Sequence, residues 1–131
     1  MAGRPPLSKG EMEVARELWQ LGTATVRQVH EAFPAEREID FTTVQTYLRR
    51  LETKGYVKAK LVGRTLVYSS RVEPRKVIGQ AVDELVDRLF GGETLPLMQH
   101  LIEEGSITDS ELAKLRRLID RLDNQEPRDA R

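Results

Sequence analysis

The sequence predicts a mainly α-helical chain with one small β-hairpin, and three observations support this. Apolar residues recur at helical spacing through most of the 131 residues, and one alternating pattern lies over residues 56–70. The charge balance also changes along the chain. Residues 1–72 carry 12 basic and 8 acidic residues, a net charge of +4, whereas residues 73–131 carry 9 and 13, a net charge of −4. This asymmetry predicts a first half that binds a polyanion and a second half with another task.

The composition excludes several kinds of protein. The chain has no cysteine, which excludes a disulfide framework and a thiolate metal site. His30 and His100 are the only histidines and lie far apart in the sequence, so we expect no metal site and no cofactor. No apolar run approaches the ~18 residues that span a membrane, and no signal-peptide pattern opens the sequence. We therefore expect a cytoplasmic protein that does not insert into a membrane.

The first predicted helix begins with a capping box, in which Ser8 caps the helix and Glu11 follows three residues later. Gly22 ends this helix. Its apolar residues include Trp19, the only tryptophan, which we expect in the core. The preceding residues 1–7 are short, polar and proline-rich, and we expect them to form a mobile arm.

A second helix is predicted over residues 26–33. Residues 23–25 open it, and Pro34 ends it because the residue before a proline disfavours helical geometry. We expect His30 to be a surface or hydrogen-bonded histidine rather than a metal ligand. Residues 35–39 form a polar link to the next helix.

Residues 40–55 predict the helix around which the chain is organised. Val44, Tyr47, Leu48 and Leu51 fall within one apolar sector at 100° per residue. A face of hydroxyls, an amide and arginines on the other side can bond to base edges and phosphates. A solvent-exposed face that lacks acids by chance would have the same composition. The residues of this face are Thr42, Thr46, Arg49 and Thr53, flanked by Gln45 and Arg50.

From residue 56 the spacing of apolar residues changes from helical to alternating, which predicts a β-hairpin. Gly63 and Arg64 form its turn, and the second strand follows over residues 65–70. Three helices followed by a basic hairpin predict a winged helix-turn-helix, whose third helix enters the major groove while the hairpin, or wing, lies along the DNA backbone. The alternation places Val57, Ala59 and Leu61 on one face and Lys58 and Lys60 on the other.

Residues 73–122 predict three further helices. Pro74 begins the first, and a capping box of Thr108 and Glu111 begins the last. Three short helices cannot bury apolar stripes of this width by themselves, so an identical chain is the expected partner. The alternative is that these helices fold back on the winged helix. The expected dimerisation residues are Val82, Leu85, Leu89, Leu101, Leu112, Leu115, Leu118, Ile119 and Leu122.

With these elements placed, residues 7–122 resemble the penicillinase repressor family. The matching segments are LSKGEMEVARELW, ATVRQVHEAF, FTTVQTYLRRLETKGYV, GRTLVYS and TDSELAKLRRLIDRL. The resemblance implies a homodimeric winged-helix transcriptional repressor that binds a double-stranded dyad operator, with a DNA-binding domain over residues 1–72 and a helical dimerisation domain with a short polar tail over residues 73–131. The candidate DNA contacts are Thr42, Thr43, Gln45, Thr46, Arg49 and Arg50 on the helix, and Lys58, Lys60 and Arg64 on the hairpin.

Two features depart from the family pattern. Copper-responsive members carry a C-terminal cysteine cluster, which this chain lacks, so direct sensing through thiolates is excluded. Antibiotic-responsive members are cut by a membrane sensor protease at an Asn-Phe bond, which falls here on His100 and Leu101. The family's pair is not reproduced here, so His100 and Leu101 form only a candidate cleavage region, and a membrane sensor protease is a candidate partner implied by the resemblance.

Two other classes of function are alternatives to DNA binding. A winged helix that serves only as a protein-interaction module needs no basic surface, yet residues 41–72 carry a net charge of +6. A small hydrolase needs a nucleophile, a base and an orienting group, and no such set can be assembled from this sequence. The acidic residues Glu36, Glu38 and Asp40 precede a helix and need no catalytic role. The sequence therefore does not predict an enzyme.

Overall fold

The computed structural model describes residues 4–125 of the chain. The chain divides into two compact units, Met1–Gly79 and Gln80–Arg131, and each is described by itself. Among the described residues, no helix combines the length and the apolar character that a membrane crossing requires.

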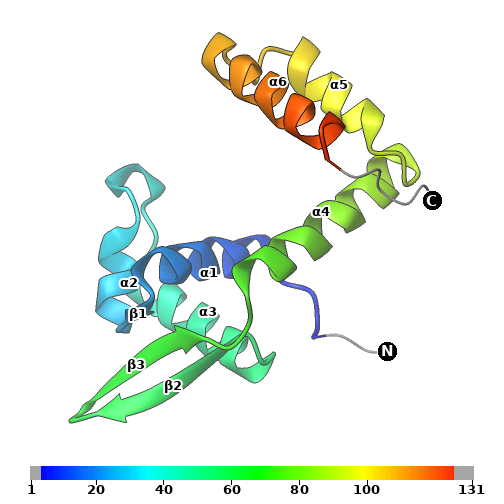
Figure 1. Cartoon of the computed structure of the whole chain (residues 1–131). Coiled ribbons are helices and arrows are strands. Elements are labelled where there is room, and N and C mark those ends of the chain that lie inside the picture. Colours follow the sequence, from blue (N-terminus) through cyan, green and yellow to red (C-terminus); the bar gives the residue numbers. More distant parts are fainter. Residues whose placement is uncertain (1–3, 126–131) are drawn as a thin grey trace. The chain divides into compact units, whose positions relative to one another are not determined.

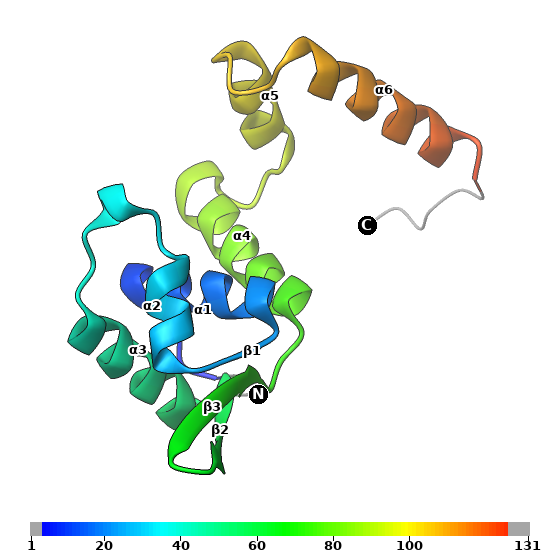
Figure 2. The same ribbon diagram turned by 90° about the vertical axis from the view of Figure 1, so that its left-hand side faces the viewer.

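The first unit is a small helical bundle with a three-stranded antiparallel sheet (Figures 1 and 2). Helices α1 and α2 both pack against α3, and the β2–β3 hairpin follows α3 directly. This arrangement confirms the predicted winged helix-turn-helix. Its elements are α1 Lys9–Leu21, β1 Thr23–Ala24, α2 Val26–Ala32, a 3₁₀ turn Ala35–Arg37, α3 Phe41–Thr53, β2 Val57–Val62, β3 Thr65–Ser70 and the start of α4 Pro74–Phe90.

Capping side chains fix where the first helices begin. The Ser8 hydroxyl accepts a hydrogen bond from the Glu11 N–H at 3.2 Å, and the Glu11 carboxylate accepts one from the Ser8 N–H at 2.8 Å. The predicted capping box of α1 is thus confirmed. A second box, which the sequence analysis missed, joins Thr25 and Gln28 at the start of α2. Asp40 precedes α3, but its side chain accepts no hydrogen bond from that helix.

The sheet has the strand order β1-β3-β2. Strand β3 of the wing therefore pairs with β1 on one side and with β2 on the other. Thr23 pairs with Ser69 and Ala24 with Tyr68. The expectation that residues 23–25 open a helix is therefore wrong for the first two, which form β1; only Thr25 caps α2. A strand of two residues is too short to produce a periodic signal in the sequence.

The core of the first unit lies between α1, α2, α3 and the sheet. Leu48 and Leu51 are fully buried, as expected. Trp19, expected in the core, is only partly buried and packs against it, as does Phe33, while Val14 and Leu18 of α1 are fully buried. The buried apolar set is Val14, Ala15, Leu18, Ala24, Val29, Val44, Leu48, Leu51, Tyr56, Val57, Tyr68 and Val77.

The prediction of a mobile N-terminal arm is wrong for the described residues 4–7. Three successive residues are bonded to the segment that joins α3 to the wing. Arg4 Nε donates to the Gly55 carbonyl at 2.7 Å, the Tyr56 hydroxyl donates to the Pro5 carbonyl at 2.6 Å, and Lys54 Nζ donates to the Pro6 carbonyl at 2.9 Å. The first three residues lie outside the described part of the chain.

The second unit contains the remainder of α4, α5 Leu95–Glu103 and α6 Asp109–Asp123. The predicted capping box at the start of α6 is confirmed, with the Thr108 hydroxyl accepting from the Glu111 N–H at 3.2 Å. Large apolar side chains remain exposed, including Leu89 at 61% and Ile119 at 57%. The predicted division between residues 72 and 73 stays a prediction.

Candidate nucleic-acid interface

Helix α3 separates an apolar inner face from a polar outer face. Val44, Leu48 and Leu51 are completely buried against α1 and α2. Because residues three and four positions apart share one face of a helix, burial of these three determines which side chains face the solvent. Thr42, Thr46, Arg49 and Arg50 are exposed, and Thr43 and Gln45 are half-buried.

The segment before α3 is held by contacts between side chains and backbone. His30 Nε2 lies 2.8 Å from the Ile39 carbonyl oxygen, and the His30 ring makes an edge contact with Phe41 at 5.8 Å between centroids. The expectation of a hydrogen-bonded histidine is therefore confirmed. Arg37 also forms a two-pronged pair with Glu13 of α1, with the shorter N–O distance at 2.7 Å. These contacts hold the segment that leads into α3 against α1 and α2.

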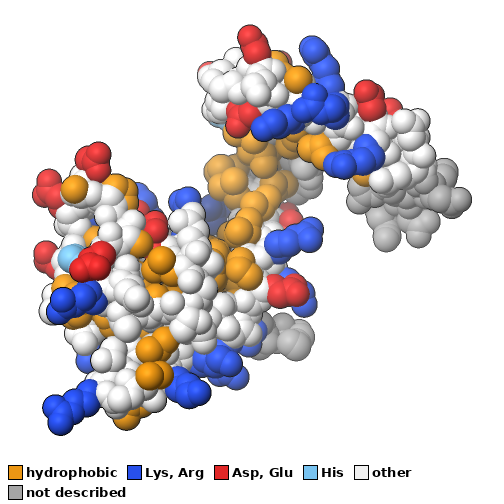
Figure 3. All heavy atoms as spheres, turned by 60° about the vertical axis from the view of Figure 1, so that its left-hand side comes forward, with side chains coloured by type: hydrophobic (Ala, Val, Ile, Leu, Met, Phe, Trp, Pro, Cys, Tyr) orange, Lys and Arg blue, Asp and Glu red, His pale blue; other side chains and the backbone are white. Residues whose placement is uncertain are grey.

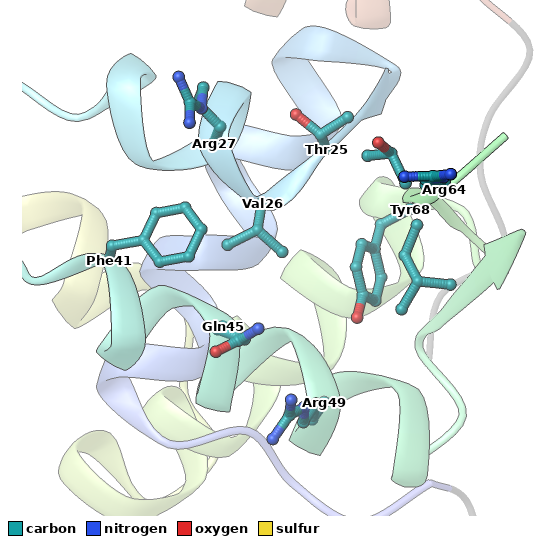
Figure 4. Close-up of a pocket in the computed structure, with 10 residues that line it drawn as sticks. Thr25, Val26, Arg27, Phe41, Gln45, Arg49, Arg64 and Tyr68 are labelled. Atoms are coloured by element: carbon teal, nitrogen blue, oxygen red, sulfur yellow. The ribbon is translucent and has the colours of Figure 1, made fainter. Parts of the chain in front are cut away.

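A groove of about 630 Å³ runs between α2, α3 and the wing, and we call it the wing-side groove (Figure 4). Three arginines, Arg27, Arg49 and Arg64, come to it from these three elements. None of the described residues that line it is acidic. The described residues that line it are Thr25, Val26, Arg27, Phe41, Gln45, Arg49, Arg64, Thr65, Leu66 and Tyr68.

A shallower depression of about 260 Å³ lies on the other side of α3 and is lined by Thr42, Thr43, Thr46, Tyr47 and Arg50. The Arg50 guanidinium lies over the Tyr47 ring, 5.7 Å from its centroid, an arrangement in which the aromatic face attracts the cation. The Tyr47 ring in turn lies so close to Gly10 that a Cβ there would stand 2.5 Å from Cζ. The tyrosine thus supports Arg50 at this edge.

The wing carries the remaining candidate residues. Lys58 and Lys60 are exposed on β2, and Arg64 is exposed in the turn, where Gly63 has a φ of 63° that favours glycine. Figure 3 shows basic side chains gathered at the lower end of the first unit and acidic ones toward its upper end. The structure thus brings Gln45, Arg49 and Arg64 to one groove, while the two lysines lie outside its lining.

Lys54 contributes to the net positive charge of residues 41–72, but its ammonium group is already paired. Lys54 Nζ lies 2.6 Å from a Glu11 carboxylate oxygen, and Glu11 is 2% exposed. Burial alone would raise the pKa of Glu11, but the hydrogen bonds from Lys54 and from the Ser8 N–H bring that pKa below its ordinary value. Lys54 therefore positions α3 against α1 and is not available for a phosphate.

Sequence reasoning missed two residues of the wing-side groove, Arg27 and Tyr68. Arg27 lies in the first turn of α2. The spacing of apolar residues within α2 does not indicate that this turn lies beside α3. Tyr68 belongs to β3, and its position under α3 follows from strand pairing with Ala24 and Ala59. Only the packing of the three elements brings these side chains together.

Comparisons with known proteins identify a family of relatives and a solved structure that shares the fold. Residues 7–121 match the penicillinase repressor family. The transcriptional regulator BlaI of Mycobacterium tuberculosis (strain CDC 1551 / Oshkosh) is 33% identical over 125 residues, which cover 94% of this chain and 89% of the relative. The penicillinase repressor of Bacillus licheniformis is 22% identical over 121 residues, 92% of this chain and 94% of the relative. The solved structure of Bordetella bronchiseptica BpsR shares the fold, with a TM-score of 0.51, 15% identity and coverage of 90% and 80%.

Proposed function

The chain belongs to the penicillinase repressor family, and from this premise we propose that it acts as a homodimer on a dyad operator. Membership makes it a DNA-binding transcriptional repressor. The observation that supports the operator contacts is the outer face of α3, which is polar, carries Arg49 and Arg50, and borders a groove whose described lining holds no acidic residue.

In this proposal α3 enters the major groove and the wing follows the backbone. Gln45 and Thr46 contact base edges, since amide and hydroxyl groups can both donate and accept hydrogen bonds there. The basic residues contact phosphates, which fix the register and supply most of the sequence-independent affinity. The phosphate contacts are Arg49, Arg50, Lys58, Lys60 and Arg64.

Apolar exposure in the second unit supports the dimer. Val82 is 42% exposed, Leu118 44% and Leu122 47%, and side chains of this kind gathered on one unit are typical of an interface. A homodimer with two-fold symmetry matches an operator with the same symmetry. The proposed dimer interface is formed by Val82, Leu85, Leu89, Leu101, Leu112, Leu115, Leu118, Ile119 and Leu122.

The proposed location is the cytoplasm, where bacterial DNA lies. A membrane sensor protease remains a candidate partner by family membership alone. The bond between His100 and Leu101 lies inside α5, so a protease would reach it only after this helix had opened locally.

Selection of random DNA duplexes by the full-length protein, without added metal or small ligand, tests this function and defines the operator. We expect an inverted repeat to be enriched. Its affinity, measured by fluorescence anisotropy, should fall with salt on a logarithmic plot with a slope of about −5 to −9, given ~3–5 phosphate contacts per subunit. A protein-interaction module would enrich no repeat and would show a flat response to salt.

A further inference from the structure

Tyr68 is an unusual residue for the floor of an open groove. Its side chain is 1% exposed, yet it lines the wing-side groove. Figure 4 shows its phenol directed into the groove toward the side where Gln45 and Arg49 lie. The ring is therefore held by the core while the hydroxyl reaches the groove.

The Tyr68 hydroxyl has no hydrogen-bond partner among the described residues. No enclosed side-chain nitrogen or oxygen in that part of the chain lacks a partner, so this hydroxyl is not sealed inside the core. Burial raises the pKa of Tyr68, and nearby Glu52 raises it further while Arg49 opposes both. The phenol consequently stays protonated at neutral pH and is a hydrogen-bond donor aimed at an acceptor from outside.

The surroundings of this hydroxyl suit a backbone phosphate. Arg27, Arg49 and Arg64 line the groove, and none of its described lining residues is acidic, although Glu52 lies near enough to affect the pKa of Tyr68. Arg27 is exposed on α2 and has no ion pair among the described residues. Val26, Phe41 and Leu66 supply apolar surface, which fits the deoxyribose on either side of a phosphate.

We propose that the Tyr68 hydroxyl and the Arg27 guanidinium bind separate phosphates of the DNA strand that runs between α2 and the wing. The inference rests on the proposed function and extends it to two residues outside the recognition helix and the wing tip. Tyr68 belongs to the rigid core, and a hydrogen bond from it to the backbone fixes how deeply α3 enters the major groove. Such a contact positions the protein without selecting a sequence.

Replacement of Tyr68 by phenylalanine removes only the hydroxyl. Loss of one hydrogen bond to a charged phosphate weakens binding by about ten-fold, so a dimer should lose about a hundred-fold. The loss should be equal for the operator and for a scrambled duplex, and the salt slope should not change because no charge is removed. The melting temperature should also stay unchanged, since the hydroxyl has no intramolecular partner.

Arg27→Ala should weaken binding and make the salt slope shallower by about one unit per subunit. Arg16→Ala is the matched control, because Arg16 is exposed on α1 and does not line the groove. Its affinity and its salt slope should equal those of the unmodified protein. An Arg27→Ala protein that behaves like this control would overturn the assignment of Arg27.

Operators that carry one neutral methylphosphonate at a time identify the phosphate itself. The unmodified protein should lose affinity at each contacted phosphate, and Tyr68→Phe should be insensitive at one of these positions. Equal sensitivity of both proteins at every position, or full affinity of a folded Tyr68→Phe protein, would overturn the proposal. If the unmodified protein enriched no duplex at all, the proposed function would fail and this inference with it.

Discussion

Gln45 and Arg64 line the same groove but should contribute differently to DNA binding. Gln45→Ala should reduce discrimination between the operator and its single base-pair variants by ~1–3 kcal/mol for each lost base contact. Arg64→Ala should weaken all duplexes by a similar factor, because a contact to the backbone carries no sequence information.

Affinities for the operator and for a full set of single base-pair variants would separate the two effects. If Arg64→Ala changed the order of preference while Gln45→Ala preserved it, the roles given to the helix and to the wing would be reversed.

Some residues of this surface could be predicted from the sequence and others could not. Gln45 and Arg49 follow from the helical period, because buried Val44 and Leu48 determine which side of α3 faces outward. The alternating pattern of β3 indicates on which face of the strand the Tyr68 side chain lies. Only the register of β3 with its neighbouring strands places that side chain under α3. That register depends on β1, a strand without a periodic signal.

At the scale of elements, the ion pair between buried Glu11 and partly exposed Lys54 joins the start of α1 to the end of α3. The pKa of Glu11 is lowered in the folded chain, so the carboxylate stabilises the fold above its unfolded pKa of about 4.3. This stabilisation is lost as the pH falls through the lowered folded pKa. Glu11→Gln should therefore cost about 1–3 kcal/mol at neutral pH and progressively less in acid.

Urea denaturation of both proteins between about pH 7 and pH 3 would measure this difference. A difference in unfolding free energy that stayed constant across this range would show that the charge of Glu11 does not stabilise the contact between the two helices.

Local signals explain which elements the sequence predicted. The capping boxes at Ser8 and Thr108 involve residues three positions apart and were visible in the sequence. The sequence does not reveal how the N-terminal arm is held, because its hydrogen bonds connect residues about fifty positions apart. Arg4, Pro5 and Pro6 all contact the segment between α3 and the wing, so the arm supports the junction of the two proposed DNA-binding elements.

At the scale of the whole molecule, the chain combines a unit with its own core and a unit with exposed apolar residues. Val77 of α4 is buried in the core of the first unit, although the sequence predicted the domain boundary before residue 73. A fragment meant to fold alone should therefore extend to Gly79, where the first unit ends. A cut after Val72 would remove Val77 and leave a gap in the core.

The fragment of residues 1–79 should be a folded monomer that binds the operator much more weakly than the full chain. A dimer makes its second contact effectively within one molecule, a gain of typically 10²–10⁴ in affinity or about 3–5 kcal/mol. Leu118→Glu in the full chain should cause the same loss by placing a charge on the proposed interface, whereas Arg117→Glu, on the polar side of α6, should leave the dimer intact. Sedimentation velocity and anisotropy on all three proteins would measure mass and affinity together. A monomeric fragment that bound the operator as tightly as the full chain would exclude dimerisation as the source of affinity.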